Sequence, residues 1–517
     1  MAKVPSKTPA PSQPPLAVPH RLIRGIIGLI CFIAGAAIMV IEISANRLLA
    51  PNFGNSLYTW TALIGVILIS FSVGGFLGGW LADRMKRVDL LGWLLTGAAA
   101  FAMLIPLLNG MLAPQLSTGG LVSGPVLISL LLFALPGILL GAVSPASVRF
   151  YSLAGHDEHV GIAAGTISML GSLGSFVGTF LSGFILLSSY GVREIFIGTG
   201  IVLLLLAAAA FYLARKSPKV QGGAVAVVLL CGLLNFASGS EAERGVLYQK
   251  ASFYHQIKVV EQAGQRDLQL DSTLEGGMTW PGGDLVLDYQ RYWRLAQLNE
   301  ELKIKRALFI GAGAFGMPEH VAQLGKDVSV DVAEIDPAVI ETGRRFFKLD
   351  EFPTVKAHAS DARLFLQRSK EAKYDLIFGD AYNGVRHIPA HLVTREFFKQ
   401  VQEHLSDNGV FLINVISAVQ GERAVLLGHI IATLRAVFPE VEVFAVGRDG
   451  VTAQNVILLA SMKSWKPWLQ DRFYAANSWQ GDLVHSRVTS DFWPPLQPVL
   501  TDNWNPVDAV IAQQLAK

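Results

Sequence analysis

The hydrophobic pattern changes its period near residue 240, and the two halves of the chain predict different kinds of structure. Before that point the chain holds apolar stretches long enough to cross a bilayer as helices, near residues 22–45, 57–82, 90–112, 124–148, 160–189, 194–214 and 221–238. After residue 244 the apolar runs are short and separated by polar turns. The pattern therefore predicts a multi-pass α-helical membrane domain followed by an α/β domain.

Small residues are dense in the membrane half and predict close packing between its helices. Glycines recur in two runs, at Gly74, Gly75, Gly78 and Gly79, and at Gly171, Gly174 and Gly178. Such runs let two helix backbones approach in lipid, where packing replaces the hydrophobic effect. The segment 78–87 (GGWLADRMKR) also resembles the loop after the second span of major facilitator transporters.

A nucleotide-binding pattern begins at an apolar strand of the soluble half. This strand runs into a glycine loop that contains Gly311, Gly313 and Gly316. A helix-compatible stretch follows, and a second apolar strand ends in Glu334 and Asp336. In a βαβ unit with this spacing of about 20 residues, the glycines let the backbone approach the ligand and the acid bonds ribose hydroxyls. The segment predicts a nucleoside-type cofactor.

Three acids close three successive apolar strands of the soluble half. They are Glu334, Asp361 and Asp380, and Ala362 follows the second of them. Strands that alternate with helices form a mostly parallel, doubly wound sheet, whose ligands bind at the carboxyl ends of the strands. We therefore expect the three acids to share one site.

These patterns divide the chain into four segments. Residues 1–20 are rich in Pro, Ser and Lys and predict a disordered N-terminal tail. Residues 21–240 form the polytopic membrane domain, with six to seven spans. Residues 244–300 form a small substrate-side β subdomain, in which residues 254–271 alternate like a hairpin. Residues 301–517 form a Rossmann-like nucleoside-binding catalytic domain.

Composition argues against several classes of function. Of 517 residues 51% are hydrophobic and 16% charged, and a net charge of +2 without a basic stripe argues against a nucleic-acid partner. Both cysteines, Cys31 and Cys231, lie in apolar segments, so neither a disulfide framework nor a thiolate zinc site is supported. His387 and His391 have Pro389 between them and no acids nearby in the sequence, so we expect no metal site.

Residues 248–420 resemble the spermidine synthase (polyamine aminopropyltransferase) family, and the whole chain resembles its membrane-fused bacterial members. The resemblance rests on the glycine loop, on the three strand-end acids and on residues 500–508 (LTDNWNPVD), which are similar to a C-terminal signature of the fused group. It implies the fold of class I methyltransferases. It also implies transfer of an aminopropyl group from decarboxylated S-adenosylmethionine to a small amine acceptor, with release of methylthioadenosine.

The resemblance also implies roles for individual residues. The glycine loop approaches the nucleoside, Glu334 binds ribose hydroxyls, and Asp361 faces the adenine amine. Asp380 takes the place of the catalytic aspartate, which removes a proton from the attacking amine. Tyr254 and Tyr292 lie on the substrate side.

Three departures from the family pattern change the residues expected to bind the amine acceptor. The family has an aspartate in its glycine loop where this chain has Ala314, and its catalytic loop has a second acid that residues 380–384 (DAYNG) lack. Its YHE segment becomes Tyr292-Trp293-Arg294, which replaces an acid by a cation. These changes weaken the electrostatic fit to a dicationic diamine.

Three functions therefore stay open. The first is a membrane-bound aminopropyltransferase. The second keeps the fold and is an S-adenosylmethionine-dependent methyltransferase with a small or membrane-delivered acceptor. The third is a transporter-like protein whose soluble domain senses a nucleoside or a polyamine without turnover. We expect the lipid bilayer as a partner in every case, and the family resemblance adds a homo-oligomer as an expectation.

Positive charges in the membrane half gather in alternate loops and set the topology. They precede the first span and follow the second, fourth and sixth, at Lys3, Lys7, Arg21, Arg24, Arg84, Lys86, Arg87, Arg149, Arg215, Lys216 and Lys219. By the positive-inside rule the N-terminus is cytoplasmic. Six spans would leave the soluble domain in the cytoplasm, and seven would place it outside. Because sulfonium nucleosides are made in the cytosol, we expect an inner-membrane protein with a cytoplasmic catalytic domain and residues 221–238 re-entrant or interfacial.

Overall fold

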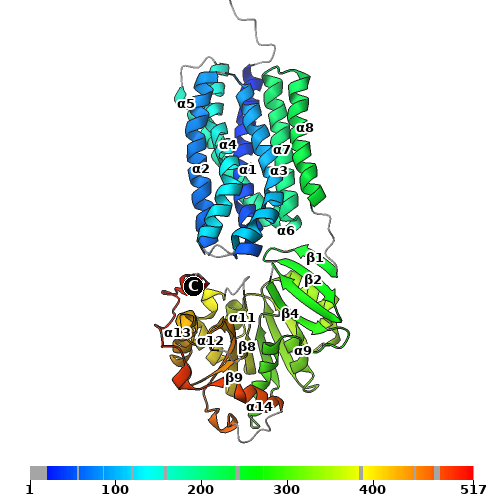
Figure 1. Cartoon of the computed structure of the whole chain (residues 1–517), viewed down its shortest axis with the longest axis vertical. Coiled ribbons are helices and arrows are strands. Elements are labelled where there is room, and N and C mark those ends of the chain that lie inside the picture. Colours follow the sequence, from blue (N-terminus) through cyan, green and yellow to red (C-terminus); the bar gives the residue numbers. More distant parts are fainter. Residues whose placement is uncertain are drawn as a thin grey trace, which may run out of the picture.

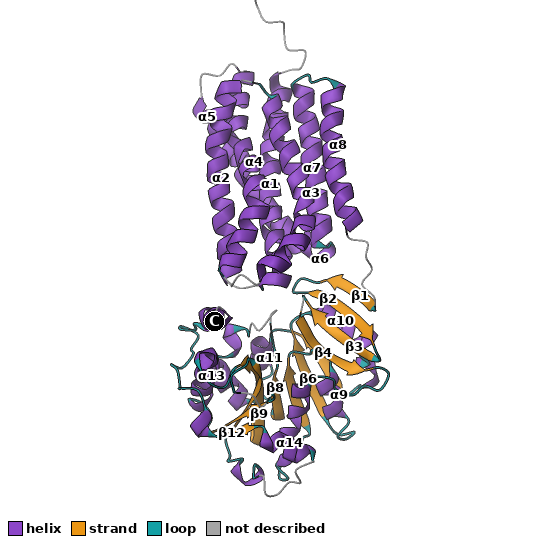
Figure 2. Cartoon of the chain, viewed as in Figure 1, coloured by secondary structure: helices purple, strands orange, loops and turns teal. Residues whose placement is uncertain are grey.

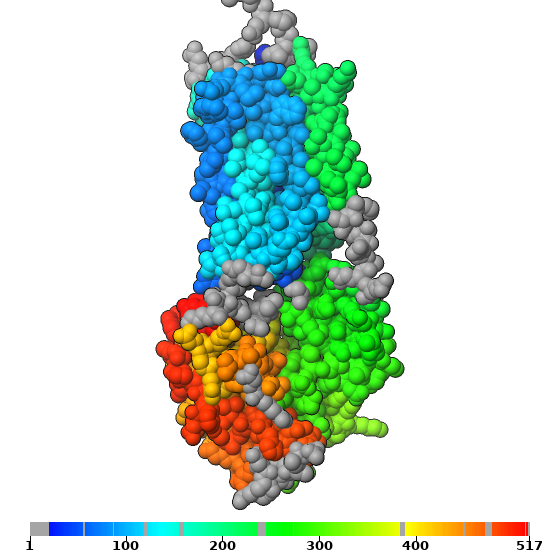
Figure 3. Space-filling view, viewed as in Figure 1, coloured from blue at the N-terminus to red at the C-terminus, as the bar shows by residue number. Residues whose placement is uncertain are grey.

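A bundle of long helices stands end to end with an α/β domain (Figure 1; Figure 3). The structure is a computed structural model, and it describes residues 20–54, 57–85, 87–117, 122–155, 160–238, 245–271, 273–382, 388–447, 450–470 and 478–515. The predicted N-terminal tail lies outside the described residues except for His20, at which the first helix begins.

Seven helices in the described part of the chain are long and apolar enough to cross a membrane. They are α1 (His20–Phe53), α2 (Leu57–Met85), α3 (Asp89–Leu116), α4 (Ser123–Gly155), α5 (Val160–Phe180) with its continuations η2 (Leu181–Leu186) and α6 (Leu187–Ser189), α7 (Val192–Leu213) and α8 (Pro218–Ser238). Each apolar stretch expected to span the membrane corresponds to one of these helices. The first four extend past the predicted limits because they continue into more polar residues at their ends.

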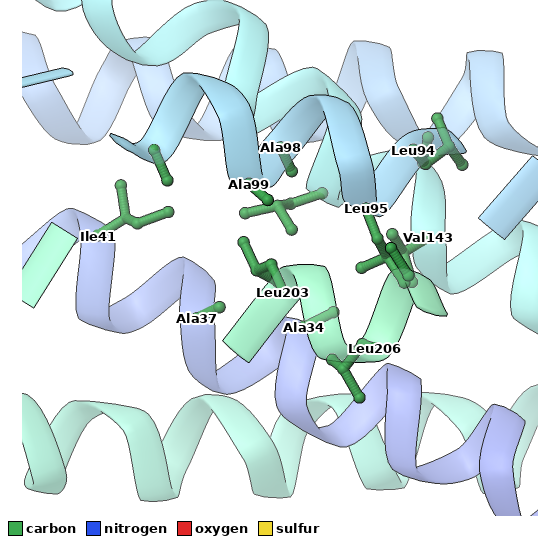
Figure 4. Packing of buried hydrophobic residues seen from close by; sticks show 14 of the residues in the cluster. Ala34, Ala37, Ile41, Leu94, Leu95, Ala98, Ala99, Val143, Leu203 and Leu206 are labelled. Atoms are coloured by element: carbon green, nitrogen blue, oxygen red, sulfur yellow. The ribbon is translucent and has the colours of Figure 1, made fainter. Parts of the chain in front are cut away.

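Small residues bring the helices of the bundle close together, as the glycine runs predict. A Cβ atom on Gly74 of α2 would clash with the backbone of α4 at Ile138, and one on Gly174 of α5 would clash with the backbone of α1 at Phe32. In the centre of the bundle, alanines of α1 and α3 lie beside larger side chains of α7, such as Leu203 (Figure 4). Close backbone packing is thus the role of these glycines.

The last helix of the bundle, α8, is continuous and packs along α3 and α7 (Figure 1). Its residues Ala224 and Val228 are buried in the bundle core. The structure therefore does not support a re-entrant or interfacial segment at residues 221–238, since this stretch buries apolar side chains as an ordinary bundle helix does. The chain enters the bundle at one end and the α/β domain lies at the other (Figure 1). The expectation of a cytoplasmic domain relied on an even number of spans, so it loses its basis.

A small antiparallel sheet follows the bundle (Figure 2). Its strands are β1 (Val246–Ala251), β2 (Gln256–Gln262), β3 (Gln265–Leu270) and β4 (Thr273–Thr279), paired in that order. The predicted hairpin is β2 and β3, joined at Ala263 and Gly264, which both have positive φ. The helical spacing of residues 285–298 predicts a helix, and the structure forms the 3-10 helix η3 (Asp288–Leu298) there.

The large sheet has eight strands in the order β12-β10-β11-β9-β8-β5-β6-β7. The strands are β5 (Arg306–Ile310), β6 (Ser329–Glu334), β7 (Val355–Ala359), β8 (Tyr374–Gly379), β9 (Leu405–Ser417), β10 (Glu440–Ala445), β11 (Gln454–Ser461) and β12 (Arg487–Val488). The five from β7 to β9 are parallel, and the other three are antiparallel. This is the doubly wound sheet that the sequence predicts.

Helices cover both faces of this sheet (Figure 2). The α-helices are α9 (Gly316–Ala322), α10 (Pro337–Phe346), α11 (Ala362–Arg368), α12 (Arg395–Glu403), α13 (Val425–Arg435), α14 (Trp479–His485) and α15 (Val507–Leu515). Short 3-10 turns are η4 (Leu349–Glu351), η5 (Ala390–Leu392), η6 (Glu422–Ala424), η7 (Lys466–Trp468) and η9 (Ser490–Phe492). Along β5, Phe309 belongs to one core and Leu308 and Ile310 to the other, so the strand is apolar on both faces.

Candidate active site

A cavity of about 160 Å³ lies at the carboxyl ends of β5, β6 and β8. The strand order reverses between β5 and β8, and a doubly wound sheet binds its ligands at such a switch point. Most of the residues expected in the site line this cavity, namely Tyr254, Gly311, Gly313, Glu334, Asp361, Ala362 and Asp380. The structure therefore brings the three strand-end acids together, as expected.

The glycine loop adopts a conformation that side chains rarely tolerate. Gly311 and Gly313 have φ of +90° and +50°, and a Cβ on Gly311 would clash with the carbonyl oxygen of Asp380. Gly316 differs, because it starts α9 and lies outside the cavity lining. A Cβ there would lie 2.8 Å from Cδ2 of Leu285, so Gly316 serves helix packing.

Glu334 is buried where β6 ends and supports the glycine loop. Its carboxylate accepts hydrogen bonds from the backbone N–H groups of Ala312 (3.0 Å) and Asp336 (2.8 Å). Burial raises the pKa of Glu334, and these two bonds oppose that rise. Asp336 does not line the cavity. It caps α10 through the N–H of Ala338 (2.9 Å) and accepts a hydrogen bond from the hydroxyl of Ser252.

Asp361 caps α11 and pairs with a histidine that sequence reasoning assigned no role. Its carboxylate accepts the N–H of Leu364 at 3.0 Å and lies 2.8 Å from Nε2 of His391. The hydrogen bond with His391 is the main reason that the pKa of Asp361 is lowered. His387 lies outside the described residues, and within the described part of the chain no cluster of His, Cys, Asp and Glu has the arrangement of a metal site.

Asp380 lies directly after β8, with its side chain held on both oxygens. Oδ2 accepts the phenol of Tyr289 at 2.9 Å, and Oδ1 accepts the side-chain amide of Asn414 at 2.8 Å. Burial raises the pKa of Asp380 to about 6, although both hydrogen bonds act to lower it. A carboxylate with this pKa is ionised at neutral pH and close enough to titration to exchange a proton.

The two tyrosines expected on the substrate side have different positions. Tyr254 lines the cavity, whereas Tyr292 is buried in the core and lines neither this cavity nor its neighbour. Tyr289 makes the contact with Asp380, one turn earlier in η3. A turn of a 3-10 helix rises about 6 Å, which takes Tyr292 away from the acid.

A second cavity of about 370 Å³ adjoins the first, and the two share Glu275, Asp380 and Tyr382. The sequence patterns assigned no role to Glu275 on β4 or to Asn414 on β9. Glu275 stands in a strand with two glycines, and Asn414 lies within a long apolar strand. A polar residue inside an otherwise buried strand was the available clue to Asn414.

Comparison with known proteins agrees with this division into two parts. The Major Facilitator Superfamily model matches residues 26–227, and the Spermine/spermidine synthase domain model matches residues 290–447. A polyamine aminopropyltransferase from Vibrio vulnificus is 30% identical over 295 residues, which cover 54% of this chain and 95% of that protein. A spermine synthase from Arabidopsis thaliana is 33% identical over 111 residues, or 20% of this chain and 30% of that protein.

More distant similarities extend to methyltransferases. The human (Homo sapiens) eEF1A lysine and N-terminal methyltransferase is 28% identical over 142 residues, or 26% of this chain and 20% of that protein.

Among solved structures, a probable spermidine synthase from Corynebacterium glutamicum has a TM-score of 0.39 at 20% identity, over 46% of this chain and 85% of that one.

The fold, the cavity and these similarities define the class of the protein, which is a transferase joined to a major-facilitator-like helical region. The chain belongs to the spermine/spermidine synthase family of polyamine aminopropyltransferases.

Proposed function

We propose that this protein is a membrane-bound aminopropyltransferase that uses decarboxylated S-adenosylmethionine and an amine acceptor. The observation that carries the proposal is the position of Asp380, which lies on the boundary between two adjoining cavities. One cavity has the glycine loop and suits the nucleoside. The other, lined also by Asp288 and Asn414, suits the acceptor. The similarity to a polyamine aminopropyltransferase supports this assignment.

The proposed reaction is an in-line displacement. The neutral amine nitrogen of the acceptor attacks the methylene carbon of the aminopropyl chain beside the sulfonium sulfur. The new C–N bond forms as the C–S bond breaks, and its electron pair stays on sulfur as the thioether of methylthioadenosine. The nitrogen then gives a proton to Asp380, which Tyr289 and Asn414 hold in position.

The residues around the first cavity fit a nucleoside. Gly311 and Gly313 line the cavity with backbone and no side chain, and Glu334 and Asp361 each retain acceptor capacity beyond the bonds they already make. We assign Glu334 to the ribose hydroxyls and Asp361 to the adenine amine. Tyr254 lines the cavity, and its backbone carbonyl accepts a hydrogen bond from Arg47 of α1, so this part of the cavity wall is joined to the membrane bundle.

Calorimetric titration of the full-length protein in detergent tests the choice of substrate. We expect decarboxylated S-adenosylmethionine to bind at least 10-fold more tightly than S-adenosylmethionine, because no Lys or Arg among the described residues lines either cavity to accept the extra carboxylate. Tighter binding of the carboxylated form would contradict aminopropyl transfer.

One observation favours a second candidate, an S-adenosylmethionine-dependent methyltransferase. The chain is also similar to eEF1A methyltransferases over about a quarter of its length, 27% and 26% in two of them, and Ala314 leaves the glycine loop without a charge. The same titration separates the two, because a methyltransferase binds the carboxylated substrate more tightly.

We also infer from the seven candidate spans that the soluble domain faces away from the cytoplasm, so a sulfonium nucleoside made in the cytosol would have to cross the membrane to reach it. Arg87 and Lys216 both pair with Asp89, at 3.3 and 2.8 Å, and Arg24 bonds the carbonyl of Tyr151. Arg24 lies near the start of α1, and Arg87 and Lys216 follow the ends of α2 and α7. These helix ends lie where the chain enters the bundle, opposite the soluble domain (Figure 1). By the positive-inside rule that end is cytoplasmic.

Two reporters fused after residue 517 test this topology. Alkaline phosphatase, which folds only outside the cytoplasm, is expected to be active, and green fluorescent protein exported by the same route is expected to stay dark. The reverse pair of results would return the soluble domain to the cytoplasm and contradict seven crossings.

A further inference from the structure

Glu275 is a carboxylate between the two cavities that the proposed reaction has not yet used. It lies on β4, is half-buried, and lines both cavities. Within the described part of the chain, no residue donates a hydrogen bond to it or forms an ion pair with it. The other acids at the cavity edge differ in this respect, since Glu334, Asp361 and Asp380 each accept at least two hydrogen bonds.

The backbone of β4 packs closely against the glycine loop, so Glu275 lies beside this loop. A Cβ on Gly313 would lie 2.9 Å from the carbonyl oxygen of Glu275, and one on Gly276 would lie 2.7 Å from the backbone nitrogen of Ala314. Ala314 contributes no charge at this contact, so the charge comes from Glu275. Glu275 therefore stands beside the nucleoside loop, and it lines both cavities together with Asp380.

Acidic groups outnumber basic ones around Glu275. The titratable groups that face it from the surrounding elements are Asp271, Glu334, Asp380, Tyr289, Tyr382 and His255. No Lys or Arg lines either cavity in the part of the chain that the structure describes. An unpartnered carboxylate in such surroundings is stabilised by a ligand with a positive charge and N–H donors.

We propose that Glu275 binds the primary ammonium group of the aminopropyl chain on the sulfonium substrate. It thereby acts as the residue that selects a substrate with a free propylammonium chain and orients that chain toward the acceptor cavity. This assignment rests on the proposed function, because it requires a nucleoside in the first cavity. It gives aminopropyl transfer a specificity determinant on β4.

Protonation of Glu275 supports the assignment. Burial, together with the negative charges of Asp380, Asp271 and Glu334, raises the pKa of Glu275 to about 8. At pH 7 the empty site therefore holds Glu275 mostly protonated, while Asp380, with a pKa of about 6, is mostly ionised. An ammonium ion favours the ionised form, so its binding should release a proton from Glu275.

Two neutral-sulfur ligands isolate the ammonium group in a binding experiment. S-adenosyl-3-thiopropylamine carries the ammonium and methylthioadenosine lacks it. We expect Glu275→Gln in the full-length protein to weaken the binding of S-adenosyl-3-thiopropylamine about 10- to 100-fold, because a charge-assisted hydrogen bond is lost. The affinity for methylthioadenosine should stay within about twofold of the wild-type value. Retained binding of methylthioadenosine shows that the variant is folded. Glu301→Gln, at an exposed position outside both cavities, is the matched control.

The same titrations in buffers of different ionisation enthalpy count protons. At pH 7 the wild-type protein should release about one proton per propylamine ligand, and Glu275→Gln should release almost none. Equal weakening of both ligands, or unchanged preference for the propylamine, would overturn the role of Glu275. If wild-type protein itself shows no preference for the propylamine ligand, the aminopropyltransferase function fails instead, so the two failures are distinguishable.

Discussion

At the scale of single residues, the site depends on two carboxylates with different surroundings. Asp380 is held by Tyr289 and Asn414 and has a pKa near 6, whereas Glu275 has no hydrogen-bond donor among the described residues and has a pKa near 8. The protein donors stabilise the charge on Asp380, so it can act as a base at neutral pH. Glu275 lacks such donors, so a cationic ligand has to stabilise its charge. Glu275 is therefore suited to binding a cationic group of the substrate.

The first prediction concerns Asp380. Because a base must be ionised, kcat should rise with pH through about 6 and level off above it. Asp380→Asn should lower kcat by about 10²- to 10⁴-fold and leave the affinity for methylthioadenosine within a few fold. Steady-state rates between pH 5 and 8, with calorimetry for the affinity, check both parts. Full activity of the variant would remove Asp380 from the mechanism.

At the scale of elements, several short segments bring the site together, and α9 carries an unusual buried acid behind it. Glu319 of α9 is 3% exposed, and one of its carboxylate oxygens has no hydrogen-bond partner among the described residues. Burial, with a contribution from Glu351, raises its pKa to about 9, although Lys348 acts in the opposite direction. The folded protein therefore keeps Glu319 protonated at neutral pH.

The second prediction follows from that proton. The unfolded chain ionises Glu319 at its ordinary pKa near 4.5, so stability is greatest below that value and falls as pH rises toward 9. Glu319→Gln mimics the protonated acid and should stabilise the protein by about 1–3 kcal/mol at pH 7, with a smaller effect at pH 5. Unfolding followed by tryptophan fluorescence at both pH values measures this. A destabilised variant would mean that Glu319 is charged in the fold.

The sequence predicts the elements well and the details of the site less well. Hydrophobic periodicity predicts each membrane helix and the β2–β3 hairpin. The positions of Glu334, Asp361 and Asp380 at strand ends predict that they share one cavity, and all three line it. The partner of Asp380 could not be predicted, because the choice between Tyr289 and Tyr292 depends on how η3 docks onto the sheet. Glu275 could not be predicted either, since its role depends on contact between β4 and the glycine loop.

At the scale of the whole molecule, one arginine joins the membrane bundle to the wall of the cavity. Arg47 near the end of α1 donates to the carbonyls of Ser252 (2.6 Å) and Tyr254. Ser252 bonds Asp336, and Tyr254 lines the first cavity. The loop between β1 and β2 thus contacts both the bundle and the site, so the position of α1 affects the shape of the nucleoside cavity.

The third prediction tests this connection. Arg47→Ala should raise the Kd for methylthioadenosine about 3- to 10-fold, because the loop that carries Tyr254 loses its anchor on the bundle. Arg47→Lys keeps one donor and should have a smaller effect. Arg291→Ala is the matched control. It removes an exposed cation that pairs with Asp288 inside the soluble domain, so it should leave methylthioadenosine binding unchanged. Identical affinities for all three variants would mean that the two domains act independently.

The products of the reaction show whether the protein transfers an aminopropyl group. Purified full-length protein is incubated with decarboxylated S-adenosylmethionine, S-adenosylmethionine and a panel of small amines, and the mixture is analysed by mass spectrometry. We expect methylthioadenosine together with an equal amount of an amine that carries a new aminopropyl group. S-adenosylhomocysteine with a methylated acceptor would contradict it.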